Sequence, residues 1–119
     1  FIGSPAMNII KGESKNKQIS FGNGATLKTN SDYNGKVNVG LRPEDFKVDE
    51  NGPIKLKVEL VELIGANTLI HGKLENSEEI LVASIAGVVS ESKIGKNIGL
   101  SFDESKLHLF DMNSDQRIN

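Results

Sequence analysis

The side chains that could do chemistry in this 119-residue chain are few and scattered. His71 and His108 are its two histidines, and each stands apart in sequence from other good metal ligands. A zinc centre needs about three or four converging ligands, so neither histidine predicts a catalytic metal. His71 falls within an expected strand and is predicted to be a structural histidine. His108 alternates with Leu107 and Leu109, which predicts an outward-facing side chain.

The carboxylates and glycines do not have the spacing of a catalytic or phosphate-binding site. The pairs Glu44–Asp45, Glu78–Glu79 and Asp103–Glu104 occur at expected turns, where nothing supplies the burial that raises a pKa for acid–base work. Gly95–Lys96 lacks the earlier glycine and the following Ser or Thr of a phosphate-binding loop. Gly22–Gly24 lacks the third glycine of a dinucleotide fingerprint. No cysteine is present and no serine sits in a nucleophile-elbow pattern, so the residues predict no enzyme.

Charge and composition narrow the classes of partner. The chain has 14 basic and 16 acidic residues, a net charge of −2, and its lysines are spread singly, so the sequence shows no basic cluster for a phosphate backbone. Tyr33 is the one tyrosine, beside an expected turn, and most of the five phenylalanines fall at core positions. An OB-fold nucleic-acid-binding module is therefore the weakest alternative. No apolar run approaches the ~20 residues that span a bilayer. Lysine outnumbers arginine twelve to two, a bias that indicates a bacterium with AT-rich coding sequence.

Strict alternation makes residues 54–60 the clearest strand. It predicts that one face is buried and that the charged residues between face water; the predicted buried residues are Ile54, Leu56, Val58 and Leu60. The alternation breaks at Leu60–Val61, which predicts a bend. Gly65–Asn67 then supplies a turn and Thr68–Leu74 the returning strand of a hairpin, with Gly65 at positive φ.

The rest of the chain reads as short strands between turns of Gly, Asn and Ser. Further strands are expected at residues 7–10, 18–21, 25–27, 36–41 and 79–85, with 98–102 and 107–110 as a closing pair. Pro43 predicts a helical turn, and 12–17 reads as an exposed loop. The predicted fold is all-β, a small OB-like barrel with short helical turns only, forming one domain over residues 1–110. Residues 111–119 are expected to be a frayed polar tail.

Four short motifs, in order, carry a resemblance to a known family. They are Gly3-Ser4-Pro5 with Met7-Asn8, then Gly40-Leu41-Arg42-Pro43-Glu44, then Glu62, Gly65 and Thr68 within the stretch 60–71, and His108-Leu109-Phe110. Together they resemble the C-terminal part of sugar-importer ABC ATPase subunits of the maltose and glycerol-phosphate importer type, a region known as a TOBE domain. The opening from Phe1 to Asn8 is similar to the point where that family's chain leaves its nucleotide-binding domain, so the resemblance implies one end of a longer protein.

The resemblance implies a regulatory and dimerising domain for carbohydrate import, without catalysis or cofactor of its own. ATP and magnesium would bind in the missing N-terminal domain. The implied partners are a second copy of the ATPase subunit, membrane permease subunits and, in some members, a regulatory protein of the sugar phosphotransferase system, but no nucleic acid. The implied location is cytoplasmic, peripheral on the inner face of the membrane.

Three residues are the candidates for an interface. Arg42 and Glu44 flank the rigid Pro43 and could meet each other, as a weak exposed ion pair, or a partner chain. Glu62 lies beside apolar neighbours and is expected to pair with a backbone donor or a lysine. The alternative function is an oxyanion site of the kind found in a related subset of TOBE domains, for which the available hydroxyls are Ser4, Thr68 and Ser84.

Overall fold

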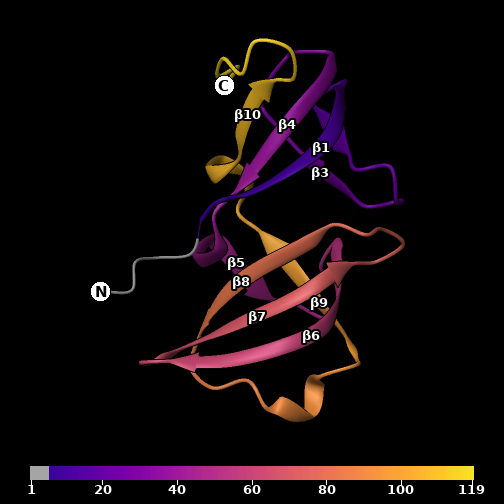
Figure 1. Cartoon of the computed structure of the whole chain (residues 1–119). Helices are drawn as coiled ribbons and strands as arrows, with labels where there is room; N and C mark the ends of the chain where they lie inside the picture. Colours follow the sequence, from indigo (N-terminus) through magenta and orange to yellow (C-terminus); the bar gives the residue numbers. More distant parts are fainter. Residues whose placement is uncertain (1–5) are drawn as a thin grey trace.

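The computed structural model describes residues 6–119 and confirms the all-β prediction, with two five-stranded antiparallel sheets and three 3-10 turns (Figure 1). The first sheet has the order β10-β4-β1-β2-β3, with bounds β1 Asn8–Lys15, β2 Gln18–Ser20, β3 Thr26–Lys28, β4 Gly35–Leu41 and β10 His108–Asp111. The second has the order β5-β9-β6-β7-β8, with bounds β5 Phe46–Val48, β6 Ile54–Ile64, β7 Asn67–Leu74, β8 Ile80–Ala86 and β9 Asn97–Phe102. The turns are η1 Pro43–Asp45, η2 Glu91–Lys93 and η3 Glu104–Lys106. The motif at residues 3–5 lies outside the described residues.

Alternating apolar residues from both sheets build the core. In β4, the side chains of Val37, Val39 and Leu41 are fully buried. In β6, Leu56 is also fully buried, and Ile54 and Val58 are each 1% exposed. Because side chains alternate across a strand, the residues between these point away from the core. The alternation in the sequence therefore predicts the buried face of β6 correctly from Ile54 to Val58.

The bend predicted in β6 is a β-bulge, and it reverses the strand's two faces. Val58 lies opposite Gly72, but Leu60 lies opposite His71, so Glu59 is an extra residue in β6. One inserted residue moves every later side chain to the other face. Leu60 is consequently 48% exposed, and its predicted burial is wrong.

Strands β9 and β10 are not the closing pair that their sequences suggest. β9 pairs with β5 and β6, whereas β10 pairs with β4 in the other sheet. The chain changes sheets through η3, where the Asp103 carboxylate accepts a hydrogen bond from the Ser105 backbone N–H at 3.0 Å. An acidic cap of this kind starts a new turn and ends the strand.

Residues 12–17 are not the expected loop. β1 continues through Lys15 and pairs with β4 and β2, and only Asn16 and Lys17, at φ 52° and 60°, form the turn. The alternation of small and charged residues in this stretch conceals a strand whose inner positions are Gly12 and the buried Ser14.

The last residues also differ from the expected frayed tail. Arg117 bridges to Phe110, the Ile118 N–H donates to the Leu109 carbonyl at 2.7 Å, and the Asn119 amide donates to the Leu107 carbonyl at 2.7 Å. The chain therefore turns after β10 and returns alongside it. The division into one domain and a tail stays a prediction.

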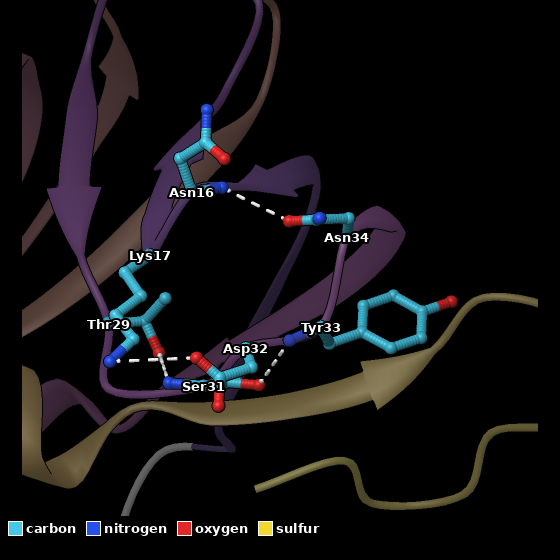
Figure 2. A network of polar contacts seen from close by, with 7 residues as sticks. All are labelled: Asn16, Lys17, Thr29, Ser31, Asp32, Tyr33 and Asn34. Atoms are coloured by element: carbon cyan, nitrogen blue, oxygen red, sulfur yellow. Dashed lines mark hydrogen bonds and ion pairs between the residues drawn. The ribbon is translucent and has the colours of Figure 1, made fainter.

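The connection between β3 and β4 is held by side chains of small polar residues (Figure 2). The Ser31 N–H donates to Thr29 Oγ1 at 3.1 Å, and the Tyr33 N–H donates to Ser31 Oγ at 3.2 Å. The Asn16 N–H donates to Asn34 Oδ1 at 3.1 Å, which ties this connection to the β1–β2 turn. These bonds satisfy backbone groups that the irregular segment would otherwise leave unpaired.

Asn8 joins the two sheets. Its side-chain amide donates to the Leu41 carbonyl of β4 and to the Val82 carbonyl of β8, both at 2.9 Å, and its Oδ1 accepts from the Val82 N–H at 2.9 Å. β8 is the last strand of its sheet, so Asn8 supplies the donor and acceptor that a further strand would supply there. A second link is the Asn23 amide, which donates to the Glu75 carbonyl at 2.6 Å.

Candidate functional site

The β6–β7 hairpin presents apolar side chains to solvent at its tip. Its two-residue turn has Gly65 at φ 61° with a non-positive φ at Ala66, the pattern of a type II′ hairpin, so the predicted hairpin and glycine conformation are confirmed. Leu63 and Ile64 precede the turn and are 61% and 40% exposed. Figure 1 shows this hairpin extending from the lower sheet to the left of the view.

The loop after β8 is fastened to the same tip. Thr68 Oγ1 donates to the Gly87 carbonyl at 2.7 Å and accepts from the Val89 N–H at 3.1 Å, while the Gly87 N–H donates to the Ala66 carbonyl at 2.8 Å. Val88, which is 80% exposed, is thereby held near the hairpin. Because Thr68 lies directly opposite Leu63, these bonds place the loop on the side of the hairpin that carries Leu63. Leu63, Ile64 and Val88 are called the apolar tip below.

Glu62 pairs with His71 behind the apolar tip. Glu62 Oε1 lies 2.7 Å from His71 Nε2, an ion pair when the imidazole is protonated. The partner is thus neither the backbone donor nor the lysine that the sequence predicts, because the bulge moves Glu62 onto the face that carries His71. His71 has the hydrogen bond expected of a structural histidine.

The corner after β4 holds the other two predicted interface residues. Arg42 and Glu44 are both exposed on either side of the buried Pro43, which confirms the predicted turn at Pro43. Arg42 Nε–H donates to His108 Nε2 at 3.4 Å and not to Glu44, whereas Asp45 pairs with Lys106 at 3.7 Å. The Glu44 carboxylate therefore makes no ion pair within the described residues.

The hydroxyls considered for an oxyanion site are not brought together. Thr68 is buried, and its hydroxyl is used by the Gly87 and Val89 backbone. Ser84 lies opposite Leu69, one position from the Thr68–Ile85 pair, so it points to the other face of the second sheet. Ser4 lies outside the described residues.

One further hollow lies away from the predicted interface residues. A hollow of about 660 Å³ lies between the β5–β6 turn and the loop of residues 88–93, with Val48, Val89 and Ile98 in its lining. Among residues 6–119 no group of three or more His, Asp or Glu side chains is placed to hold a metal ion. Within the same residues no helix is long and apolar enough to cross a membrane.

The apolar tip is what sequence reasoning missed. Val88 and Leu63 are apolar residues near strands and read as core by type alone. Their exposure depends on where β6 changes faces and where β8 ends. The one local signal in the sequence is the broken alternation at Leu60–Val61. It indicates the bulge but does not indicate which later side chains become exposed.

Two small antiparallel sheets that pack their apolar faces into one core define an all-β, OB-like domain. Comparison with known families agrees, because the TOBE domain family matches residues 39–110 and the MalK OB fold domain family matches residues 3–46. The chain belongs to the TOBE domain family, and the family resemblance of its sequence motifs is confirmed.

The similar curated proteins are ATP-binding subunits. The chain is 39% identical over 118 residues to the sn-glycerol-3-phosphate import ATP-binding protein UgpC of Ruegeria pomeroyi, covering 99% of this chain and 33% of that protein. It is 34% identical over 126 residues to UgpC of Escherichia coli, covering 99% and 35%. It is also 34% identical over 122 residues to the uncharacterized ABC transporter ATP-binding protein YcjV of Escherichia coli O157:H7, covering 93% and 33%. The chain thus spans about a third of the length of these relatives.

A solved structure shares the fold. The cytoplasmic molybdate-binding protein ModG, with molybdate bound, superposes with a TM-score of 0.68 over 91% of this chain and 98% of that chain. The two sequences are only 13% identical, so this likeness concerns the fold alone.

Proposed function

We propose that this chain is the regulatory and dimerising domain of an ATP-binding subunit that drives carbohydrate or glycerol-phosphate import. The observation that carries the proposal is the identity of 34–39% to sn-glycerol-3-phosphate import ATP-binding proteins over 99% of this chain. ATP and magnesium then bind in another part of the protein, and that part contacts the membrane permease subunits. The assembly sits on the inner face of the membrane, and a regulatory protein of the phosphotransferase system is a further proposed partner.

The apolar tip is the proposed contact with the second subunit. Exposed apolar side chains gain about 25 cal/mol per Å² when an interface removes them from water. The Gly87 N–H bond to the Ala66 carbonyl and the two bonds of Thr68 Oγ1 order the tip, so less conformational entropy is lost on docking. Glu62, beside the tip, is proposed as its polar complement. Arg42 and Glu44 lie at another corner of the domain and are proposed as interface residues for a partner chain.

Cysteine crosslinking tests this contact, since the chain has no cysteine of its own. Leu63→Cys or Val88→Cys, placed in the whole ATP-binding subunit after removal of any other cysteines, is expected to give a crosslinked dimer with a short bismaleimide. The matched control is Lys28→Cys, an exposed strand position of the first sheet. Equal crosslinking of all three positions, or none at Leu63 and Val88, would count against the apolar tip as the contact.

The proposed location of ATP has a direct test on this chain. Stabilisation by a ligand follows RT ln(1 + [L]/Kd), so saturating Mg-ATP is expected to leave the Tm unchanged. A rise of several degrees would place a nucleotide site in this domain and contradict the proposal.

Oxyanion binding is the second candidate function, because a protein of the same fold is described as molybdate-binding. The Thr68 hydroxyl already has backbone partners, so we expect no heat of binding when molybdate or sulfate is titrated into the chain. Saturable binding of molybdate, lost in Ser84→Ala, would favour the oxyanion function instead.

A further inference from the structure

The outer face of the first sheet is assembled from residues far apart in the sequence. In β4 the inward residues are apolar, so Lys36, Asn38 and Gly40 face outward, and Arg42 follows in the same alternation. The register pairs Lys11 of β1 with Asn38, and Phe110 of β10 pairs with Asn38 from the other side. Figure 1 shows β10, β4 and β1 side by side in the upper sheet.

This face carries a charge opposite to that of the whole chain. Its outward positions include one acidic residue among those described, Glu13, which lies opposite Lys36 and Ser20. The cationic side chains at outward positions are all exposed, and they are Lys11, Lys15, Lys28, Lys36, Arg42 and Arg117. The chain as a whole has a net charge of −2, so its remaining surface is strongly acidic. The outer face of β10, β4, β1, β2 and β3 is called the basic face below.

The centre of the basic face is ordered by aromatic and imidazole rings. His108 and Phe110 stack with centroids 6.5 Å apart and planes 9° from parallel. Gly40 beneath them has no room for a side chain, since an added Cβ would overlap Met7 and lie 3.1 Å from His108 Cβ. The rings and Met7 therefore lie directly over the backbone of β4.

Both arginines of the chain converge on His108. Arg42 Nε–H donates to its Nε2 at 3.4 Å, and Arg117 lies across from Phe110 on the same face. Partial burial, followed by the nearby charges of Arg117 and Arg42, lowers the pKa of His108 below its ordinary value. The lowered pKa favours the neutral imidazole, whose Nε2 can accept the Arg42 hydrogen bond.

We infer that the basic face is a docking surface for an acidic protein. Arginine and aromatic side chains are the residues enriched at the centre of protein interfaces, and here Arg42, Arg117 and Phe110 lie together with lysines around them. A predominantly basic surface steers an acidic partner toward it and disfavours a basic one. A two-fold contact between two copies through this face is disfavoured, because it would bring two predominantly cationic surfaces together.

The composition of the face disfavours a nucleic acid as its occupant. Single strands bind to OB-type sheets through several exposed aromatic rings. Phe110 is the one phenylalanine or tyrosine at an outward strand position among the described residues of this face, and it is half-buried and stacked on His108. A hollow of about 290 Å³ beside Lys11 and Lys36 has Phe21 as its one aromatic lining residue, so it offers no row of rings for successive bases.

The test is an NMR titration of the ¹⁵N-labelled chain with poly-L-glutamate of about 20 residues as the acidic probe. We expect the amides of Lys11, Phe110 and Arg117 to shift, and the apparent affinity to fall at least fivefold between 50 and 300 mM NaCl. A 20-base-pair DNA duplex and vesicles of phosphatidylcholine with phosphatidylglycerol are titrated in parallel. Tighter binding of the duplex or the vesicles through the same amides would overturn the assignment to a protein partner.

Charge reversal makes the test specific to the face. Arg42→Glu combined with Arg117→Glu is expected to weaken poly-glutamate binding at least tenfold. The matched control, Lys57→Glu with Lys93→Glu, makes the same change in net charge on exposed positions of the second half of the chain and is expected to stay within about twofold. Equal losses in both variants would show that net charge alone, and no particular face, attracts the probe. An unchanged affinity in the first variant, or shifts outside the basic face, would overturn the inference, whereas the crosslinking of the apolar tip is independent of either result.

Discussion

Asn8 is the residue whose removal most directly tests how the two sheets are held together. Asn8→Ala deletes three hydrogen bonds of 2.9 Å at a site where the side chain is buried, with 9% of its surface exposed. The alanine leaves the Val82 N–H and carbonyl and the Leu41 carbonyl without that partner. A buried group left unsatisfied costs about 1–3 kcal/mol, and a carbonyl costs less than an N–H because it has two lone pairs through which it can find another partner. We expect a loss of about 2–4 kcal/mol in the free energy of unfolding.

The assay is urea denaturation followed by circular dichroism near 218 nm, since the chain contains no tryptophan for fluorescence. Asn8→Asp separates hydrogen bonding from size. Its carboxylate still accepts from the Val82 N–H, but its second oxygen faces the Leu41 and Val82 carbonyls, so it is expected to be at least as unstable as the alanine variant at pH 7. Asn30→Ala, at an exposed position, is the matched control and is expected to lie within about 0.5 kcal/mol of the parent.

The relative stabilities of the three variants show whether the Asn8 hydrogen bonds hold the two sheets together. A parent-like stability of Asn8→Ala would refute the view that Asn8 satisfies the edge of β8. A loss in which Asn8→Asp is clearly more stable than Asn8→Ala would show that the two carbonyl contacts contribute nothing. The slope of the denaturation curve adds a further check, because uncoupled sheets would unfold in separate steps and lower it.

The remaining predictions concern single positions of the barrel. Gly65→Val, at φ 61°, is expected to cost about 1–3 kcal/mol by backbone strain alone, with Ala66→Val as its control in the same turn, measured by thermal denaturation. Gly72→Ala is expected to cost about 2–3 kcal/mol, because its Cβ would overlap the Lys57 carbonyl oxygen and lie 2.8 Å from Leu56 Cγ, and equal stability would show that β6 and β7 separate freely. His108 has a lowered pKa in the folded chain, so the unfolded chain takes up a proton more readily, and stability is expected to fall as pH drops below about 6.5. His108→Gln should reduce the difference in Tm between pH 7.5 and 5.5, and an NMR titration giving His108 a pKa above 6.5 would contradict this.

Local pattern was enough to predict most strands and the hairpin turn. The alternation around Leu56 fixes which side chains enter the core, and Gly65 occupies the one turn position that needs positive φ. Pro43 likewise starts its turn where a fixed φ is compatible with it. In each case a few neighbouring residues determine the backbone conformation, so the local sequence is sufficient to predict it.

Features that depend on pairing could not be predicted in the same way. The exposure of Leu60 follows from a bulge of one residue, which alternation indicates only as a break. The partner of Glu62 is His71, and that depends on the register between two strands. The basic face needs Lys11, Arg42 and Arg117 to meet through three strand pairings, so lysines that look scattered in sequence gather on one side of a sheet.

The segment from Leu41 to Asp45 connects these surfaces within the fold. The Leu41 carbonyl accepts a hydrogen bond from the Asn8 side chain, and Arg42 belongs to the basic face. The turn that starts at Pro43 packs against β8. β8 is also the strand that leads into Val88 of the apolar tip. A force or a bound partner at Arg42 therefore acts on residues that are in contact with the second sheet, and the Asn8 side chain is the polar part of that contact. Because Asn8 belongs to neither the basic face nor the apolar tip, Asn8→Ala in an otherwise folded chain can weaken the link between the two surfaces while leaving both intact.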